Sequence, residues 1–169
     1  MRSISSRPTN PASVSWILLW LMAGILGCAR CDKESRREED IAQIRKFLET
    51  AGEAVNMGDV EAEVNRFTED GIYMWPDAPA IEGREALREW FERRFARVEA
   101  HIESRTEELV VFGDWAFERG TSVVRVRQKN STHVDTVRGK HINILRRQPD
   151  GSWKIARRIR NRDHAPGQP

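Results

Sequence analysis

The sequence has few cysteines and no obvious metal ligands. Its only two cysteines in 169 residues, Cys28 and Cys31, lie near the beginning, so the rest of the chain holds no disulfide, cysteine-ligated zinc or cysteine nucleophile. The histidines are not spaced as metal ligands, and we expect neither a metal ion nor another cofactor. They are His101, His133, His141 and His164.

No apolar run in the sequence has the length of a typical membrane span. The longest uncharged, mostly apolar stretch covers residues 14–26, whereas a helix that crosses a bilayer needs about 20 apolar residues. A polar segment with Arg2 and Arg7 precedes this stretch. A basic start followed by a short apolar run is typical of a signal peptide.

The apolar run ends in Ile25-Leu26-Gly27-Cys28. This ending resembles the lipobox of bacterial lipoproteins, in which the cysteine is lipidated and becomes the new N-terminus. The resemblance implies a lipoprotein signal peptide over residues 1–27, then lipidated Cys28 and a short charged tether over residues 28–39. We therefore expect an exported protein, anchored by lipid at Cys28 to the membrane of the bacterial cell envelope and facing the periplasm or the exterior. The alternatives are an uncleaved anchor and an ordinary secretory signal.

The remaining residues have the composition of one folded domain. Hydrophobic residues make up 39% of the chain and charged residues 32%, with six tryptophans, which excludes a disordered or collagen-like protein. Residues 32–113 are mostly acidic among their charges, whereas residues 114–169 are mostly basic. The basic residues either meet solvent, pair with the acids, or lie near anionic lipid headgroups. An exported domain without base-stacking motifs is not expected to bind nucleic acid.

Helical periodicity predicts three helices. Apolar residues recur every three or four positions over residues 40–57, over residues 59–67, and after Gly83 as far as Phe95. Gly58 can end the first of these helices in the left-handed conformation. A short strand is predicted at residues 72–75, with Glu69 and Asp70 interpreted as a turn that ends the second helix.

After Phe95 the apolar period changes to two, which predicts strands. A hairpin signal stands at Gly113-Asp114, and long strands are expected at about residues 115–128, 134–147 and 152–161. Residues 164–169 are interpreted as a flexible tail. The order α-α-β-α-β-β-β-β predicts an α+β domain, with three helices packed on one curved antiparallel sheet.

Several stretches resemble the SnoaL-like, ketosteroid-isomerase-like families of the nuclear transport factor 2-like superfamily. They are Thr68-Glu69-Asp70-Gly71, residues 76–83 followed by Arg84-Glu85-Ala86-Leu87, Gly139-Lys140-His141, and residues 150–157. The resemblance spans residues 40–163. It implies a cone whose open end holds a pocket between the sheet and the helices, often in a homodimer.

The catalytic groups of the ketosteroid isomerases do not carry over to this chain. In those enzymes a carboxylate abstracts a proton, while a tyrosine and a protonated aspartate stabilise the oxyanion. The corresponding positions here are Trp75 for the base, Ala51 for the tyrosine and Asn143 for the aspartate. We therefore do not expect the ketosteroid isomerase reaction.

Other polar residues are candidates for the pocket. His141 and Asn143 share one strand face, and Asp77 lies in a loop that can supply a base, so these three are the candidate catalytic residues. Candidate ligand contacts are Trp75, Trp90, Phe91 and Arg157. Structural roles remain open for each of them, as a hydrogen-bonded histidine or asparagine, a turn aspartate, a salt-bridged arginine or core aromatics.

Three functions follow from these residues. The first is a lipoprotein that binds a small, partly apolar molecule in its pocket. The second is a metal-free acid/base enzyme of the isomerase, cyclase, dehydratase or hydrolase type, and the third is a dimeric docking module. Aromatic side chains that fill the cone would weaken the first two, whereas an open cavity with His141, Asn143 and a carboxylate within hydrogen-bond reach would favour an enzyme.

Overall fold

The computed structural model describes residues 33–163. The predicted signal peptide, Cys28 and the tail from residue 164 lie outside the described residues. Residues 33–39 of the expected tether are helical, and a compact unit begins at Asp40. No helix in the described part of the chain is both long and apolar enough to cross a membrane.

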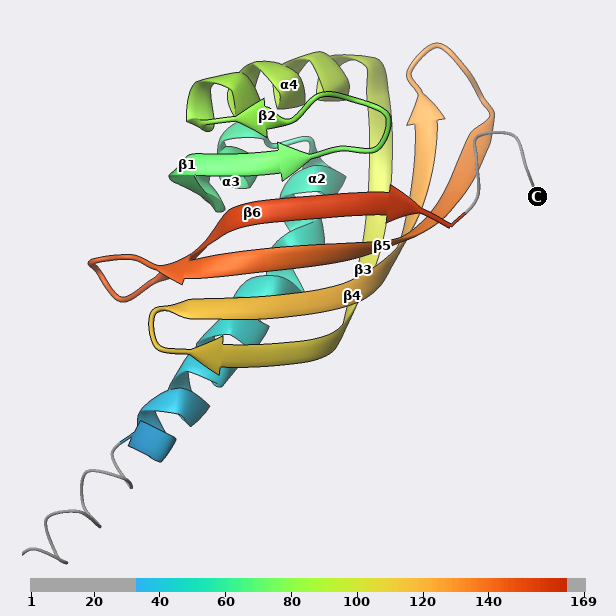
Figure 1. The fold of residues 1–169 in the computed structure, drawn as a ribbon. Coiled ribbons are helices and arrows are strands. Elements are labelled where there is room, and N and C mark those ends of the chain that lie inside the picture. The colour runs from blue at the N-terminus through green and yellow to red at the C-terminus, as the bar shows by residue number, and fades with distance from the viewer. Residues whose placement is uncertain (1–32, 164–169) are drawn as a thin grey trace, which may run out of the picture. The chain divides into compact units, whose positions relative to one another are not determined.

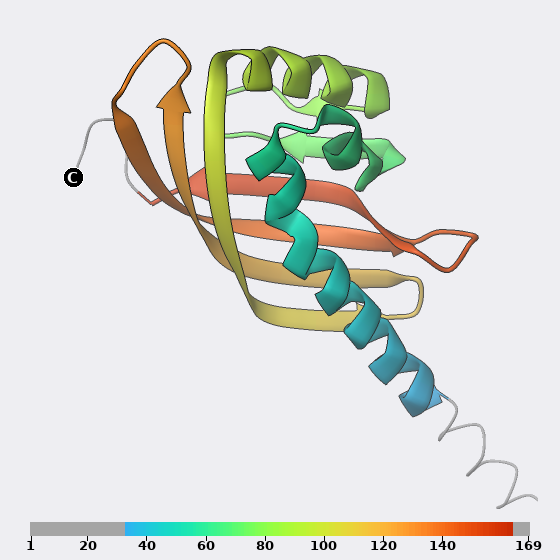
Figure 2. The same ribbon diagram turned by 180° about the vertical axis from the view of Figure 1, so that it is seen from behind.

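The compact unit is one curved sheet with helices on one face (Figures 1 and 2). The strand order is β2-β1-β6-β5-β4-β3. The strands are β1 (Phe67–Met74), β2 (Ile81–Glu82), β3 (Val98–Phe112), β4 (Trp115–Gln128), β5 (Val134–Arg147) and β6 (Trp153–Arg162). A helix over residues 40–49 continues into η1 (Thr50–Gly52) and α2 (Glu53–Met57), and α3 (Val60–Asn65) and α4 (Arg84–Arg97) follow.

The expected α+β architecture is confirmed, with two corrections to the sheet. Strands β3 to β6 form an antiparallel meander, but β1 pairs with β6 in parallel. No hairpin joins β1 to β6, so nothing forces the two to alternate in direction. Strand β1 also begins at Phe67 instead of residue 72, which places Glu69 and Asp70 within the strand and not in a turn. Phe67 is fully buried opposite Ile155, and this contact starts the strand early.

The predicted first helix is interrupted at η1, next to Gly52. A Cβ atom on Gly52 would lie 2.8 Å from the carbonyl oxygen of Ile102 on β3. Glycine therefore allows the chain to cross β3 at close range. Gly58 takes the left-handed conformation expected at the helix end, and Asp59 caps α3 by accepting a hydrogen bond from the amide of Ala62.

The acidic and basic parts of the chain lie side by side in strands β3 and β4. Acidic residues of β3 lie beside basic residues of β4, and the pairs are Glu99 with Arg127, Glu103 with Arg125, and Glu107 and Glu108 with Arg119. The acidic half of the sequence thus pairs with the basic half across the sheet. These pairs neutralise the three arginines and, because they are exposed, add little stability individually.

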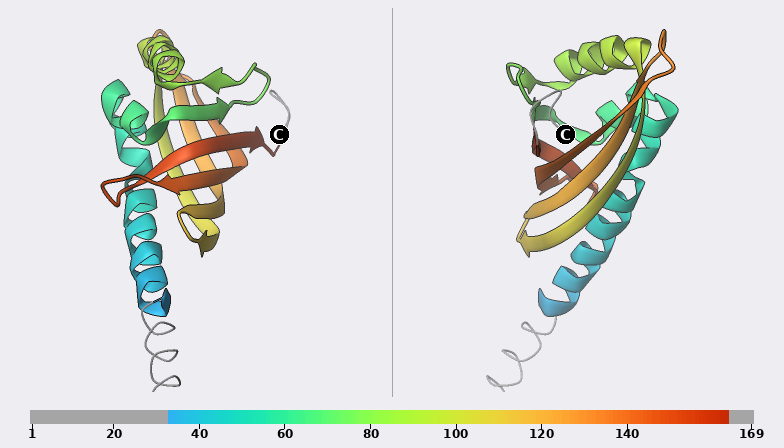
Figure 3. Two further views of the ribbon diagram at one scale, coloured as in Figure 1. Left: turned by 60° about the vertical axis from the view of Figure 1, so that its left-hand side comes forward. Right: turned by 90° about the vertical axis from the view of Figure 1, so that its right-hand side faces the viewer.

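The long strands bend as they cross the domain (Figure 3). One apolar cluster lies under α4, around Phe67, Leu87 and Phe91. A second lies against the helix over residues 40–49, around Ile44 and Leu145. Between the two clusters, the inward faces of β4, β5 and β6 carry polar residues, and this is where the candidate site is found.

Candidate functional site

A row of polar side chains runs across the inner face of the sheet. Glu118 on β4 pairs in register with Asn143 on β5, Asn143 with Arg158 on β6, and Arg158 with Tyr73 on β1. The next row joins Gly120, His141 and Arg160 on β4, β5 and β6. Since partners in register project to the same side, the sheet gathers these groups in one place.

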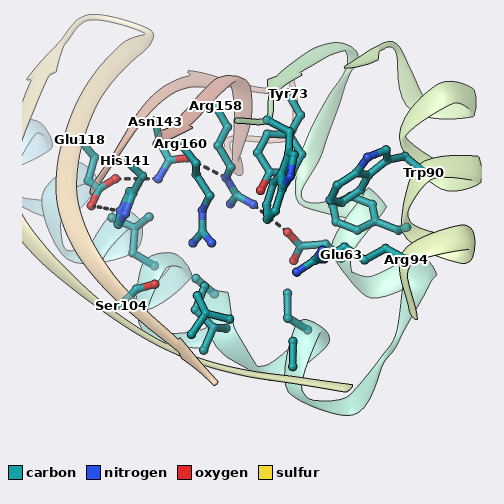
Figure 4. A pocket seen from close by; sticks show the side chains of 18 of the residues that line it. Glu63, Tyr73, Trp90, Arg94, Ser104, Glu118, His141, Asn143, Arg158 and Arg160 are labelled. Carbon is teal, nitrogen blue, oxygen red and sulfur yellow. Dashed lines mark hydrogen bonds and ion pairs between the residues drawn. The ribbon is translucent and has the colours of Figure 1, made fainter. Parts of the chain in front are cut away.

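The first row is tied together by hydrogen bonds (Figure 4). The Asn143 amide nitrogen donates to Glu118 Oε2 at 2.6 Å, and its oxygen accepts from Arg158 Nε at 2.9 Å. Arg158 Nη1 in turn donates to Glu63 Oε1 at 2.7 Å. These four side chains are buried, so each charge depends on its partners for stabilisation.

Glu118 also orients His141. Its carboxylate accepts from His141 Nε2 at 3.2 Å and from Thr106 Oγ1 at 2.9 Å. Burial raises the pKa of Glu118, but hydrogen bonds from His141, Asn143 and Thr106, with the charge that His141 carries when it is protonated, outweigh burial and lower the pKa overall. An ionised carboxylate only accepts, so Nε2 of His141 carries a proton. Nδ1 is buried and has no hydrogen-bond partner among the described residues.

Gly120 makes room for the His141 ring. A Cβ atom at Gly120 would lie 3.0 Å from His141 Cε1 and Nε2, and 2.3 Å from the carbonyl oxygen of Arg105. Only glycine fits between the two neighbouring strands at this point. The absence of a side chain at Gly120 therefore leaves the space that the His141 ring occupies.

The position of Arg157 corrects the sequence expectation. Ile155 and Ala156 are both fully buried, and the register between β5 and β6 shifts by one residue there. Such a bulge reverses which side chains face inward. Arg157 therefore lies outside the pocket and donates to the carbonyl oxygens of Asp70 and Ala156, whereas Arg158 and Arg160 line the pocket.

Asp77 also lies away from the cavity. Its side chain is 77% exposed, 4.0 Å from Arg162, and its φ of 58° is typical of a tight turn. The turn positions it at the surface, so the structure does not bring Asp77 together with His141 and Asn143.

Aromatic residues form the opposite wall. Tyr73, Trp75, Trp90 and Phe91 contact one another, and the Trp75 and Trp90 ring centroids lie 5.1 Å apart. The Arg94 guanidinium lies 4.6 Å from the centroid of Trp75. Trp75, Trp90 and Phe91 therefore lie where the sequence places them, on the cavity wall.

These side chains enclose a cavity and do not fill it. The volume of the cavity is about 60 Å³, which exceeds what one water needs. The cavity is lined on one side by the aromatic wall and on the other by His141, Asn143 and Glu118.

Sequence reasoning missed five charged residues of this cavity. They are Glu63, Arg94, Glu118, Arg158 and Arg160. Glu63 lies three residues after Val60, hence on the same helix face, and Glu118 alternates with inward-facing Ala116, so both had a periodic signal. In residues 33–163 no group of three or more histidines, cysteines and acids could hold a metal ion.

Comparison with known proteins identifies the family. The model of the SnoaL-like domain family matches residues 36–159. The chain belongs to the SnoaL-like domain family. No curated protein shows a significant match to the chain.

Solved structures share the fold of this SnoaL-like domain. A ketosteroid isomerase-like protein from Erwinia carotovora atroseptica is 27% identical, with a TM-score of 0.70, and the match covers 75% of this chain and 98% of that chain. An NTF2-like protein with a cystatin-like fold from Novosphingobium aromaticivorans is 25% identical, with a TM-score of 0.68 and coverages of 82% and 92%. ActVI-ORFA from Streptomyces coelicolor, 18% identical with a TM-score of 0.63 and coverages of 74% and 98%, shows the fold alone.

The SnoaL-like domain keeps the pocket at the place where the ketosteroid isomerase resemblance implies it. Ala51, Trp75 and Asn143, the three positions compared with the isomerase catalytic groups, all line the cavity. The cavity therefore lies where the resemblance implies a pocket, and Glu118 and His141 are among the side chains that line it.

Proposed function

We propose that this SnoaL-like domain binds a small, partly apolar molecule in its cavity and moves a proton on it with His141. One observation carries the proposal: His141 lines the cavity with Nε2 on the buried carboxylate of Glu118 and Nδ1 unpartnered among the described residues. A histidine held by a carboxylate through one nitrogen can accept a proton at the other. The carboxylate also stabilises the imidazolium that forms.

The aromatic wall of the cavity is evidence that part of the ligand is apolar. Trp75, Trp90 and Phe91 offer ring faces and edges to a flat molecule. A pocket with an apolar wall and a few convergent polar groups is the usual form of a small-molecule site. The cavity volume favours a ligand of few atoms.

A generic proton-transfer probe tests the base directly. The probe is 5-nitrobenzisoxazole, a neutral aromatic molecule: a base removes its C–H proton while the N–O bond breaks, and a coloured nitrophenolate is released. The full chain, in a nonionic detergent, should convert the probe faster than free imidazole. His141→Ala should lower this rate by about 10²-fold or more, whereas His133→Ala, at an exposed histidine, should leave it unchanged. Equal rates for wild type and His141→Ala would contradict the base.

Binding without turnover is the second candidate. It is favoured by Asn143, whose amide is engaged on both sides by Glu118 and Arg158, so that this network already has partners without a ligand. The same probe separates the two functions. Saturable binding of the probe, measured by calorimetry, with no rate above imidazole would support a binding protein.

We also propose that the domain works at the cell envelope as a lipid-anchored homodimer. The anchor rests on the sequence Ile25-Leu26-Gly27-Cys28. The dimer is supported by apolar side chains on the outer sheet face, where Ile142 is 37% and Ile159 is 44% exposed and the two are cross-strand partners. A contiguous apolar patch of this kind is typical of an interface. A dimer without a ligand would be the third candidate, the docking module.

A further inference from the structure

Two arginines line the cavity without an acidic partner. Among residues 33–163, neither Arg94 nor Arg160 has a carboxylate oxygen within 4.0 Å, and neither side chain donates a hydrogen bond. Arg160 Nε is buried and unpartnered. Arg158, by contrast, is paired with Glu63.

The two guanidinium groups come from opposite sides of the cavity. Figure 4 shows Arg160 extending from β6 toward the open centre, and Arg94 entering from the side of α4. Arg94 packs over Trp75 and Trp90, at 4.6 and 5.6 Å from the ring centroids. Because the indoles occupy its face, the N–H groups at its edge remain free to meet an acceptor.

No carboxylate on the described cavity wall forms a direct ion pair with Arg94 or Arg160, although the charges of Glu63 and Glu118 act on Arg160 from a greater distance. Glu63 is taken by Arg158, and Glu118 by Asn143, His141 and Thr106. Burial raises the pKa of Tyr73, so its phenol is neutral at physiological pH. With His141 neutral, three arginines and two carboxylates line the described cavity, so its wall carries one excess positive charge.

This excess positive charge is unfavourable in the empty protein. Burial lowers the pKa of Arg160, and burial together with the charge of Arg160 lowers the pKa of Arg94. Arginine nevertheless stays protonated, so the cost persists until an anion arrives. A ligand with one negative group would remove it.

We propose that the ligand of this cavity is a small aromatic carboxylate, an inference that rests on the proposed function. Its carboxylate is bound by Arg160 and Arg94, and its ring lies against Trp75 and Trp90. The planar guanidinium fork matches a carboxylate through two parallel hydrogen bonds. His141 then faces the same small molecule from the other side of Arg160, its cross-strand partner.

Calorimetric titration with two matched probes tests the charge requirement. Benzoate and benzamide have nearly the same size and shape, but only benzoate is negative. The full chain in nonionic detergent should bind benzoate at least about tenfold more tightly than benzamide, as expected for one or two charged hydrogen bonds. Equal affinity for the two, or no benzoate binding, would overturn the proposal.

Substitutions of the two arginines test whether benzoate binds in this cavity. Arg160→Gln and Arg94→Gln should each weaken benzoate binding about tenfold and leave benzamide binding unchanged. Arg93→Gln and Arg157→Gln are the controls, since Arg93 is exposed beside Glu89 and Arg157 lies outside the pocket. Unchanged benzoate affinity in both pocket variants would overturn the proposal.

Measurements of melting temperature and of probe turnover distinguish loss of the anion site from a loss of stability and from failure of the proposed base. Arg160 is half-buried, with its Nε buried and unpartnered. Removing this unpaired charge relieves a cost, so Arg160→Gln without ligand should melt at the same or a higher temperature than wild type. A lower melting temperature with lost binding of both probes would show a structural role and overturn the proposal. Turnover of neutral 5-nitrobenzisoxazole depends on His141 and not on anion binding, so the anion site and the proposed base can fail separately.

Discussion

Glu118 on β4 and Asn143 on β5 are cross-strand partners whose side chains meet at 2.6 Å, with the amide nitrogen of Asn143 donating to the carboxylate. This contact joins two functions of the sheet. On one side Glu118 orients His141, and on the other Asn143 leads to Arg158 and Glu63. His141, the proposed base, and the charged network are therefore parts of one hydrogen-bonded assembly.

Glu118→Gln should reduce stability by about 1–3 kcal/mol at neutral pH. The amide keeps the size of the side chain but loses the negative charge, and its nitrogen faces a donor that then lacks an acceptor. Urea unfolding of both proteins measures the difference. Glu108→Gln, which alters an exposed pair with Arg119, is the control and should change stability by less than about 1 kcal/mol.

The contribution of Glu118 should also depend on pH. Its pKa is lowered from the ordinary 4.5 in the folded protein, so its stabilising effect is present above about pH 4.5 and is lost as pH falls through the folded pKa. The difference between wild type and Glu118→Gln should therefore shrink on acidification below that value. A difference that stays constant from pH 7 to pH 3 would contradict an ionised Glu118.

Arg158 and Glu63 should be strongly coupled. Arg158→Met removes the hydrogen-bonded partner of the buried Glu63 carboxylate and leaves only Arg66, whose Nε lies 3.8 Å from it. The substitution should cost up to about 3–5 kcal/mol, whereas replacing both Arg158 and Glu63 by apolar residues of similar size should cost less. A double-mutant cycle with Glu63→Met, followed by urea unfolding, measures the coupling. Additive effects of the two substitutions would show that the 2.7 Å contact carries no interaction energy.

Gly120→Ala should disturb the site through sterics alone. The added methyl would press on the carbonyl of Arg105 and on the His141 ring, and we expect a loss of about 1–3 kcal/mol with displacement of the ring. Thr121→Ala, one residue further on the opposite strand face, is the control. Wild-type stability and an unchanged His141 NMR signal in Gly120→Ala would contradict this packing.

The inner face of β5 could be predicted from sequence, and that of β6 could not. Period two correctly places His141 and Asn143 on one face, because β5 is regular where they lie. Strand β6 contains a bulge at Ala156, and alternation counted from Trp153 then selects Arg157 in place of Arg158 and Arg160. A bulge depends on pairing with neighbouring strands, so one strand's sequence does not reveal it.

Contacts between residues that are distant in the sequence were the second feature that the sequence analysis could not predict. Glu63 and Glu118 have the spacing of inward-facing residues, but Glu63 lies in an acidic helix and Glu118 in a basic strand. Their partners Arg158 and Asn143 are distant in the sequence, so the contacts that stabilise these buried acids appear only in the folded chain. The fold itself was easier to predict, because three helices and the long hairpins follow from local apolar periods and turn residues.

The outer sheet face should mediate self-association. Ile142→Lys places a charge on the exposed apolar patch opposite Ile159 and should convert a dimer to a monomer in light-scattering measurements, with little change in melting temperature. Glu89→Lys, at an exposed position on α4, is the control and should remain a dimer. A monomeric wild-type chain would contradict the proposed homodimer.

Lipidation should depend on Cys28 and not on Cys31. Cys28→Ser should abolish incorporation of labelled palmitate in bacteria and release the protein from the membrane fraction, because a hydroxyl cannot replace the acylated thiol. Cys31→Ser is a matched control three residues away and should keep both label and membrane association. Label retained in Cys28→Ser would contradict the proposed anchor.

The protonation of the His141 ring tests the central claim most directly. Nitrogen-15 NMR of the full chain in detergent, at a pH where the ring is neutral, distinguishes a protonated from an unprotonated ring nitrogen. We predict a proton on Nε2, held by Glu118, and a free acceptor at Nδ1. A proton on Nδ1 instead would leave His141 no acceptor toward a ligand and would contradict its role as the base.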